Sequence, residues 1–386
     1  IEWDLEAASK GGYEYFMEKE IFEQPEVLVK TLNSRVDENY NINFDNAGLT
    51  KEYLSGINDI YIVACGTAYH AGLAGKHIIE KKTRIRVDVD IASEFRYRNP
   101  VIDDKALVIV LSQSGETLDT LEAMKEAKRH GARVVAITNV VGSSVAREAD
   151  HVIYTWAGPE IAVASTKAYT TQMVILNLMA IDFAYKFGKI TKDEAVEDIK
   201  KLYDVEQSIQ KMLEYDEKIK NAADKIKDSE SMFYLGRGID YVIAVEGALK
   251  SKEISYIHSE AFASGELKHG TIALITDGEL LELKPRDPYS FSYNTAIKEV
   301  RSQIEKGYGP QLCQSSVNID DFETIFIGSP NWLKTFAPPV LSFLRTTDLS
   351  GKTVIPFYTH GGGGFGHMLE DYERECNAST IKKGIA

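Results

Sequence analysis

The sequence is short of the features that mark several protein classes. It has three cysteines, Cys65, Cys313 and Cys376, and they lie far apart. An odd number of widely spaced cysteines does not build a disulfide framework or a zinc site, so we expect no metal and a reducing compartment, the cytoplasm. We find no signal peptide. No uninterrupted apolar run reaches the ~20 residues of a bilayer-spanning helix, so we expect no membrane partner.

Positive charge is also scarce, because 58 acidic residues outnumber 44 lysines and arginines and the net charge is −14. No run of basic residues is long enough to form a patch, so we do not expect binding to nucleic acid or anionic lipid. A length of 386 residues is enough for two or three domains, each with its own core. Because the chain opens with Ile1 instead of methionine, we expect a fragment of a longer protein.

From Asp59 onward, strand patterns alternate with helical ones. Apolar, β-branched runs occur at residues 60–64, 87–91, 106–111, 133–138 and 151–154. Continuous hydrophobicity indicates strands covered on both faces, which is typical of a parallel, doubly wound α/β sheet. We predict an amphipathic helical lead-in over residues 1–58, a first domain over 59–190 and a helical connector over 191–230. A second strand–glycine–helix unit covers 231–275.

The first candidate site is the turn from Leu111 to Thr117, which follows a buried strand and opens a helix. The amino end of a helix offers free N–H groups and the positive end of the dipole. Ser112, Ser114 and Thr117 add hydroxyls, and Gly115 allows a close approach of the backbone. These features suit a phosphate, although a plain serine cap explains the pattern equally well. The turn has no P-loop lysine, so no nucleotide is implied.

Two other turns carry small polar residues. Cys65 to Ala68 forms a strand-to-helix turn at the carboxyl end of a neighbouring strand, where ligands of open α/β sheets bind. We interpret Cys65 as a small buried residue and not as a nucleophile. Ser165 and Thr166 open a long apolar helix, and taken alone they are more simply a helix cap.

The helix predicted over residues 241–257 has three charges on one face, because Glu246, Lys250 and Glu253 are spaced at i, i+4 and i+7. A solvated ladder of ion pairs is the simpler interpretation. The alternative is a carboxylate that moves a proton beside a cation, as an aldose–ketose isomerisation requires. His269 lies in a glycine-flanked loop and could open a sugar ring, or it could be an ordinary surface histidine.

Together these motifs closely resemble the isomerase half of the glutamine–fructose-6-phosphate aminotransferase family, also called glucosamine-6-phosphate synthase. That half is a tandem of two sugar-isomerase (SIS) domains, and the resemblance covers about residues 1–275. The matching segments are FMEKEIFEQP at 16–25, SEFRYR at 93–98, LSQSGET at 111–117, EISYIH at 253–258 and the loop around His269.

The resemblance implies a role for each matching residue. Those that would hold the phosphate and nearby hydroxyls of fructose 6-phosphate are Thr67, Ser112, Gln113, Ser114 and Thr117, and those that would line the sugar are Val163 and Ser165. Glu253 would move the proton and Lys250 would support it. His269 would open the ring, reaching into the site of a neighbouring subunit of a homodimer. Ala68 stands where the family often has serine, which removes one phosphate contact.

Two departures from the family bear on activity. The N-terminal glutaminase domain is not in this sequence, so nitrogen would come from free ammonia or a partner. The second SIS domain stops after its first unit, and the family's closing tail with a catalytic lysine is missing. We therefore expect phosphosugar binding to survive and catalysis to be weaker than in an intact relative.

Residues 277–386 resemble the later part of short-chain flavodoxins. The matching segments are ELKP at 282–285, IGSPNW at 327–332, APP at 337–339, LSGK at 349–352 and THGGGG at 359–364. Asn331, Trp332, Thr359 and Gly361 would face a flavin. The first strand and phosphate loop of that family are missing, and Leu333 stands where a second tryptophan is common. We therefore expect neither FMN nor another cofactor to bind.

As a domain, the flavodoxin-like segment is predicted to span residues 276–386. It carries predicted strands at 280–283, 324–328, 353–357 and 380–382. Added to one strand of the second SIS unit they make five, so the sequence predicts a closed SIS/flavodoxin-like hybrid domain after one complete SIS domain. Three functions remain open. The first is a fructose 6-phosphate isomerase and aminotransferase core, the second a non-catalytic phosphosugar-binding protein, and the third an FMN electron carrier.

Overall fold

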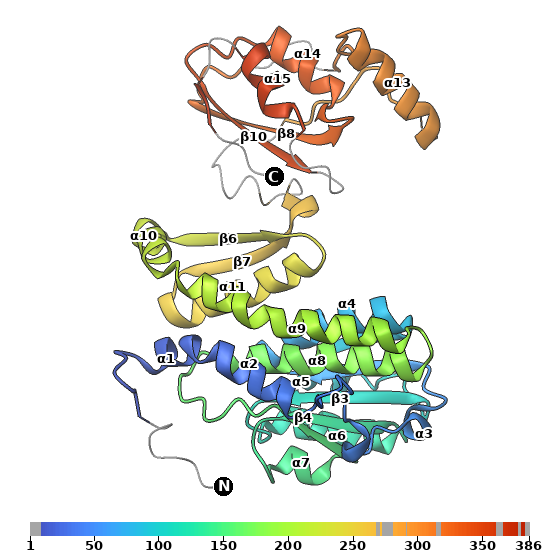
Figure 1. The fold of residues 1–386 in the computed structure, drawn as a ribbon. Coiled ribbons are helices and arrows are strands. Elements are labelled where there is room, and N and C mark those ends of the chain that lie inside the picture. The colour runs from blue at the N-terminus through green and yellow to red at the C-terminus, as the bar shows by residue number, and fades with distance from the viewer. Residues whose placement is uncertain are drawn as a thin grey trace. The chain divides into compact units, whose positions relative to one another are not determined.

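The structure is a computed structural model that describes residues 9–267, 271, 281–290, 292–313, 318–359, 366–376 and 380–382. The chain divides into two compact units, Ile1–Ala263 and Ser264–Ala386 (Figure 1). Within the described ranges, no helix combines the length and the apolar character needed to cross a membrane.

A five-stranded parallel sheet forms the centre of the first unit. It consists of β1 (Asp59–Ala64), β2 (Arg86–Ile91), β3 (Ala106–Ser112), β4 (Arg133–Thr138) and β5 (His151–Tyr154), in the order β2-β1-β3-β4-β5. The five apolar runs thus form the five strands, and the predicted doubly wound α/β class is confirmed. Strand order reverses between β1 and β3. Ligands of such sheets bind at this reversal, beside the carboxyl ends of the two strands.

Helices cover both faces of this sheet. Ile60 and Ile62 of β1 pack into one core with α4 (Gly66–Thr83), α8 (Lys167–Lys186) and α2 (Gln24–Asn33). Tyr61 and Val63 pack into the other core with α5 (Ala92–Tyr97), α6 (Leu118–Arg129) and α7 (Ser144–Glu148). Neighbouring strand residues therefore enter opposite cores, as their alternation in a strand requires.

The remaining helices of the first unit belong to the lead-in and the connector. The lead-in has α1 (Phe16–Phe22), α2, a 3₁₀ turn (Asp45–Ala47) and α3 (Lys51–Leu54). The connector has α9 (Lys192–Leu213) and α10 (Asp216–Ile226). Thr191 and Glu194 form a reciprocal capping box at the start of α9, which fixes where the connector begins.

The partial second SIS domain also lies in the first unit. It consists of β6 (Ser231–Gly236), α11 (Ile239–Ser255) and β7 (His258–Ala263), and the two strands pair in parallel. A 3₁₀ turn (Ser264–Glu266) follows β7. Tyr234 points toward α11, where its hydroxyl contacts Ser251. Phe233 and Leu235 alternate with Tyr234 and so point to the other face. There the rings of Phe233 and Phe262 lie 5.9 Å apart, and Leu235 is 39% exposed.

The second unit contains its own sheet and core. Its elements are α13 (Tyr293–Glu305), β8 (Thr324–Trp332), β9 (Thr335–Phe336), α14 (Pro338–Thr346), β10 (Thr353–Thr359), α15 (Met368–Glu375) and β11 (Thr380–Ile381). The strand order is β11-β10-β8-β9, with β9 antiparallel to β8. Val354, Met368 and Tyr372 are fully buried in its core.

The hybrid domain requires a correction. The sequence predicts a single five-stranded sheet, but β6 pairs with β7, while β8 to β11 form a separate sheet among the described residues. Strand β7 escaped prediction because residues 258–263 are polar, small or aromatic and lack the β-branched run of the other strands. Residues 281–283, predicted as a strand, are not one. The second SIS unit therefore supplies two strands instead of one.

Candidate functional site

The turn between β3 and α6 carries four of the five residues predicted to hold the phosphate and nearby hydroxyls, and the fifth, Thr67, lies on α4. Ser112 ends β3, and Thr117 immediately precedes α6. The Ser112 Oγ accepts a hydrogen bond from the Gly115 N–H at 3.0 Å and lies 3.3 Å from the Thr117 Oγ1. The Ser114 Oγ accepts one from the Glu116 N–H at 3.2 Å. With Gln113 between them, these hydroxyls gather at the amino end of a helix, where an anion is favoured.

The same turn is held rigidly. Gly115 has φ +66°, and a Cβ there would lie 2.0 Å from the Ser143 Oγ, so glycine is required. The Glu116 carboxylate accepts hydrogen bonds from the Ser144 N–H at 2.8 Å and from the Ser144 hydroxyl at 2.7 Å. Beside Gly115, the hydroxyls of Ser143 and Thr138 are buried without a hydrogen-bond partner among the described residues. The turn is thus fixed before any ligand arrives.

Thr67, in the first turn of α4, reaches across to α11. Its hydroxyl donates a 2.9 Å hydrogen bond to the Glu246 Oε1, and the His70 Nδ1 lies 2.6 Å from the Oε2 of the same carboxylate. Glu246 is buried, with 7% of its surface exposed. A buried carboxylate is tolerated where it has several polar partners. Glu246 therefore joins the crevice of the first domain to the helix of the second.

Lys250 lies between two carboxylates on α11. Its Nζ is 3.5 Å from the Glu246 Oε1 and 2.6 Å from the Glu253 Oε2. The side chains of Lys250 and Glu253 are 17% and 32% exposed, so this row is partly buried and is not a fully solvated ladder. Polar contacts thus run without a break from Thr67 to Glu253.

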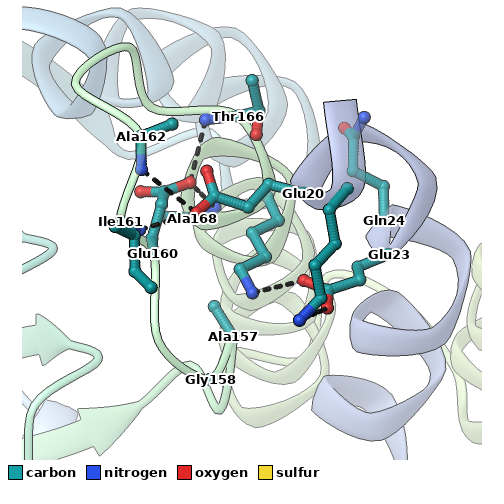
Figure 2. Close-up of polar contacts among 12 residues, drawn as sticks. Glu20, Glu23, Gln24, Ala157, Gly158, Glu160, Ile161, Ala162, Thr166 and Ala168 are labelled. Carbon is teal, nitrogen blue, oxygen red and sulfur yellow. Dashed lines mark hydrogen bonds and ion pairs between the residues drawn. The ribbon is translucent and has the colours of Figure 1, made fainter. Parts of the chain in front are cut away.

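Residues 155–166, here called the sugar loop, connect β5 to α8 and carry both residues predicted to line the sugar. Val163 is 99% exposed. Ser165 donates from its Oγ to the Glu160 Oε2 at 2.8 Å, and the other Glu160 oxygen accepts from the Thr166 and Ala168 N–H groups. Glu160 therefore fixes the end of the sugar loop where α8 begins, as Figure 2 shows.

A second carboxylate enters the sugar loop from α1. The Glu20 Oε1 accepts hydrogen bonds from the Ile161 N–H at 2.6 Å and the Ala162 N–H at 3.1 Å (Figure 2). Burial is the main cause that raises the pKa of Glu20, and these two N–H groups act in the opposite direction. The Glu20 carboxyl therefore accepts these hydrogen bonds at a site that is shielded from solvent.

Five of the predicted residues lie outside this site or outside the described residues. His269 and Gly361 are outside the described residues. Asn331 and Trp332 end β8, where the Asn331 Oδ1 accepts from the Lys334 N–H at 3.0 Å and the Trp332 ring packs edge-on against Tyr289. Thr359 ends the adjacent β10, in register with Pro330. These strand ends meet at one edge of the second sheet, and the expectation that no flavin binds there stays a prediction.

Three residues of this site, His70, Glu160 and Glu20, were not predicted from the sequence. Glu20 falls four residues after Phe16 and three after Met17, on the helix face that carries apolar positions. A charged residue at such a position signals a specific buried partner. His70 follows Thr67 by three residues and so shares its helix face. Both signals are weak without the partner residue, which lies more than one hundred positions away.

Two domain families match the sequence. The SIS domain matches residues 53–182, and the flavodoxin family matches residues 256–385. The first match covers the five-stranded sheet from α3 to most of α8. The second begins at the end of α11 and continues through the second unit.

Whole-chain comparisons agree on one group of enzymes. The chain is 52% identical over 340 residues to glutamine–fructose-6-phosphate aminotransferase [isomerizing] of Caldanaerobacter subterraneus, covering 88% of this chain and 56% of that one. It is 58% identical over 282 residues to the protein of the same name from Clostridium acetobutylicum, covering 73% and 46%. The chain thus spans about half the length of these curated relatives.

A solved structure covers nearly the whole chain. It is the C-terminal domain of glucosamine-fructose-6-phosphate aminotransferase from Francisella tularensis, which is 34% identical with a TM-score of 0.67. The match covers 97% of this chain and 90% of that one.

Proposed function

The chain belongs to the glutamine–fructose-6-phosphate aminotransferase family, through the isomerase half of those enzymes, and we propose that it binds fructose 6-phosphate and isomerises it. The observation that carries this proposal is the hydrogen bond from Thr67 to Glu246. It ties the crevice at the ends of β1 and β3 to the helix that carries Lys250 and Glu253. Thr67, in the turn after β1, is thereby joined by one run of polar contacts to Lys250 and Glu253.

The phosphate would bind at the amino end of α6. The hydroxyls of Ser112, Ser114 and Thr117 can each donate to a phosphate oxygen there, and the backbone N–H groups add the positive end of the helix dipole. The Gln113 amide can donate as well. A net charge of −14 makes this local arrangement necessary, because the protein as a whole repels a dianion.

The proton transfer would use Glu253. Its carboxylate would remove a proton from C1 of the open-chain ketose, leaving an enediolate, and would return the proton at C2. A hydroxyl proton would pass from O1 to O2 in the same interconversion, which gives the aldose 6-phosphate. The Lys250 ammonium beside it would stabilise the negative charge that develops on the enediolate oxygens. His269 would open the ring. No atom is gained or lost, so this step needs no cofactor.

We also propose a homodimer in the cytoplasm. A dimer follows from the resemblance, in which His269 completes the site of a neighbouring subunit. A reducing compartment is supported by the three cysteines, none of which forms a disulfide in the described residues. Light scattering at micromolar concentration should give the mass of two chains, and protein purified without added flavin should be colourless.

The central test joins calorimetry to an assay. Fructose 6-phosphate should bind, and a coupled assay should detect glucose 6-phosphate or, with ammonium present, glucosamine 6-phosphate. Turnover abolished by Glu253→Gln would support the assigned chemistry. Binding without turnover would instead identify a phosphosugar-binding protein, and no binding would reject the proposal.

A further inference from the structure

The lead-in helices make a set of polar contacts with the sugar loop and α8. Lys167, which is 3% exposed, lies 2.6 Å from the Glu23 Oε2. The Gln24 Oε1 accepts a 2.6 Å hydrogen bond from the Thr170 hydroxyl. Glu20 adds the two hydrogen bonds from the loop backbone, as Figure 2 shows. The lead-in helices, which precede the first domain in sequence, therefore hold the sugar loop and the start of α8 through these contacts.

Glu20 stands out among these contacts because its burial is costly. It is 2% exposed, and its Oε2 is buried without a hydrogen-bond partner among the described residues. The neighbouring Glu160 carboxylate adds repulsion, which Lys167 partly offsets. A buried carboxylate in which one oxygen lacks a hydrogen-bond partner does not stabilise a fold by itself. Its position indicates a role in placing the backbone that it contacts.

Glu20 and Glu160 hold the sugar loop on either side of its exposed tip. Glu20 binds the N–H groups of Ile161 and Ala162, and Glu160 binds those of Thr166 and Ala168. Between these two anchors lies Val163, which is 99% exposed. The conformation of the tip is therefore set by two carboxylates, and one of them comes from outside the SIS domain.

We propose that Glu20 is a positioning residue for the sugar end of the substrate. The inference rests on the proposed function, and it assigns to α1 the task of holding Val163 and Ser165 in place. The phosphate end does not depend on Glu20, because the serine turn has its own anchors in Gly115 and Glu116. Loss of Glu20 should therefore weaken recognition of the sugar and spare recognition of the phosphate.

Two conservative substitutions of Glu20 distinguish a positioning role from a general loss of structure. Glu20→Gln keeps an oxygen acceptor at the same reach and removes the charge. Glu20→Asp keeps the charge but withdraws the carboxylate by one methylene, out of reach of Ile161 and Ala162. If the acceptor position is what matters, glutamine restores function and aspartate does not.

The experiment measures the affinity of the full chain for two ligands, fructose 6-phosphate and inorganic phosphate. For Glu20→Asp we expect the sugar phosphate to bind roughly 10- to 100-fold more weakly, as for lost hydrogen bonds to a charged group. Phosphate should bind within about 3-fold of the parent protein. Glu20→Gln should match the parent for both ligands. Glu18→Asp on the exposed side of α1 is the matched control, and Ser114→Ala should weaken both ligands.

Two results would overturn the inference: parental affinity of Glu20→Asp for fructose 6-phosphate, or equal loss of both ligands. Hydrogen exchange at the Ile161 and Ala162 amides gives a readout that needs no sugar. It should be faster in Glu20→Asp than in the parent and restored in Glu20→Gln, and unchanged exchange would reject the anchor itself. If the parent protein binds phosphate but no fructose 6-phosphate, the proposed function fails while this exchange test still decides the role of Glu20.

Discussion

The Thr67 hydroxyl and the Glu246 carboxylate are 179 residues apart in the sequence, yet they share a 2.9 Å hydrogen bond. Thr67 belongs to the complete domain, whereas Glu246 belongs to the partial one. Helix α11, which carries the proposed acid–base pair, is therefore fixed against α4 by a direct contact. Weak catalysis was expected because the second SIS domain is incomplete. The contact with Thr67 shows that the position of α11 does not depend entirely on the strands that follow it.

Glu246→Ala should reduce kcat more than it raises KM. The substitution frees Lys250 from one of its two carboxylates and removes the contact that holds α11 to Thr67. A displacement of ~1 Å at a reacting group costs on the order of 100-fold in rate. Steady-state kinetics on fructose 6-phosphate measures this, with the exposed Asp240→Ala on the same helix as control. A pure KM effect would show that Glu246 does not position the catalytic pair.

Ser114→Ala should weaken phosphosugar binding by about 1–3 kcal/mol, the loss of one hydrogen bond to a charged group. The Ser114 hydroxyl sits in the turn at the start of α6 and has an internal contact with the Glu116 N–H alone in the described residues. Calorimetry with fructose 6-phosphate and glucose 6-phosphate gives the number. Unchanged affinity would remove this turn as the phosphate site.

Gly115→Ala and Gly142→Ala form a matched pair for the rigidity of the turn. Both glycines have positive φ, +66° and +72°, but a Cβ at Gly142 meets nothing within 4 Å, whereas one at Gly115 meets the Ser143 Oγ. Each variant carries a strain of roughly 1–2 kcal/mol. The Gly115 variant must also move the turn, so it should lose phosphosugar affinity while the Gly142 variant keeps it. Equal affinities would contradict a preformed turn.

Asp182 should make the first unit less stable as the pH rises. Burial is the main cause that raises the pKa of this α8 carboxyl to about 6, although Lys186 lies 2.8 Å away. The folded state thus holds the proton more tightly than the unfolded state, where the pKa is about 4. The stabilisation is complete below pH ~4 and is lost as the pH passes through about 6, amounting to about 3 kcal/mol at most.

Calorimetric melting of the parent and Asp182→Asn at pH 5 and pH 7.5 tests this titration. Asparagine keeps an acceptor for Lys186 and cannot ionise, so the advantage of the variant should grow with pH. Asp216→Asn, at an exposed position in α10, controls for net charge. A difference between parent and variant that stays constant with pH would show that Asp182 does not titrate in this range.

The first domain could be predicted from sequence because its signals are local. A strand such as β3 is buried along its whole length, so continuous hydrophobicity reports its environment directly. The serine turn could be predicted for the same reason, since Ser112 to Thr117 lie within six consecutive residues. From spacing alone, a phosphate site and a plain helix cap were equally good interpretations of this turn. The resemblance to the family favoured the phosphate site.

What could not be predicted depends on contacts between distant segments. In the sequence Glu20 looks no different from Glu18, the other acidic residue of α1, until the sugar loop is placed beside it. Strand β7 lacks a β-branched run, and its partner β6 makes it a strand. The prediction of a single hybrid sheet was wrong because the number of strands was taken from the hydrophobic pattern, which does not say which strands pair with each other.

The pair β6–β7 also has a consequence for handling the protein. Two strands with one helix form a minimal layer, and Phe233, Phe262 and Leu235 lie on the face turned away from α11. Such a layer opens at low free energy, so proteases and exchange with heavy water should act there before they reach β1 or β3. The net charge of −14 opposes aggregation at low salt, and added salt screens this repulsion. The yield and the shelf life of the purified protein should therefore be best in a buffer of low ionic strength.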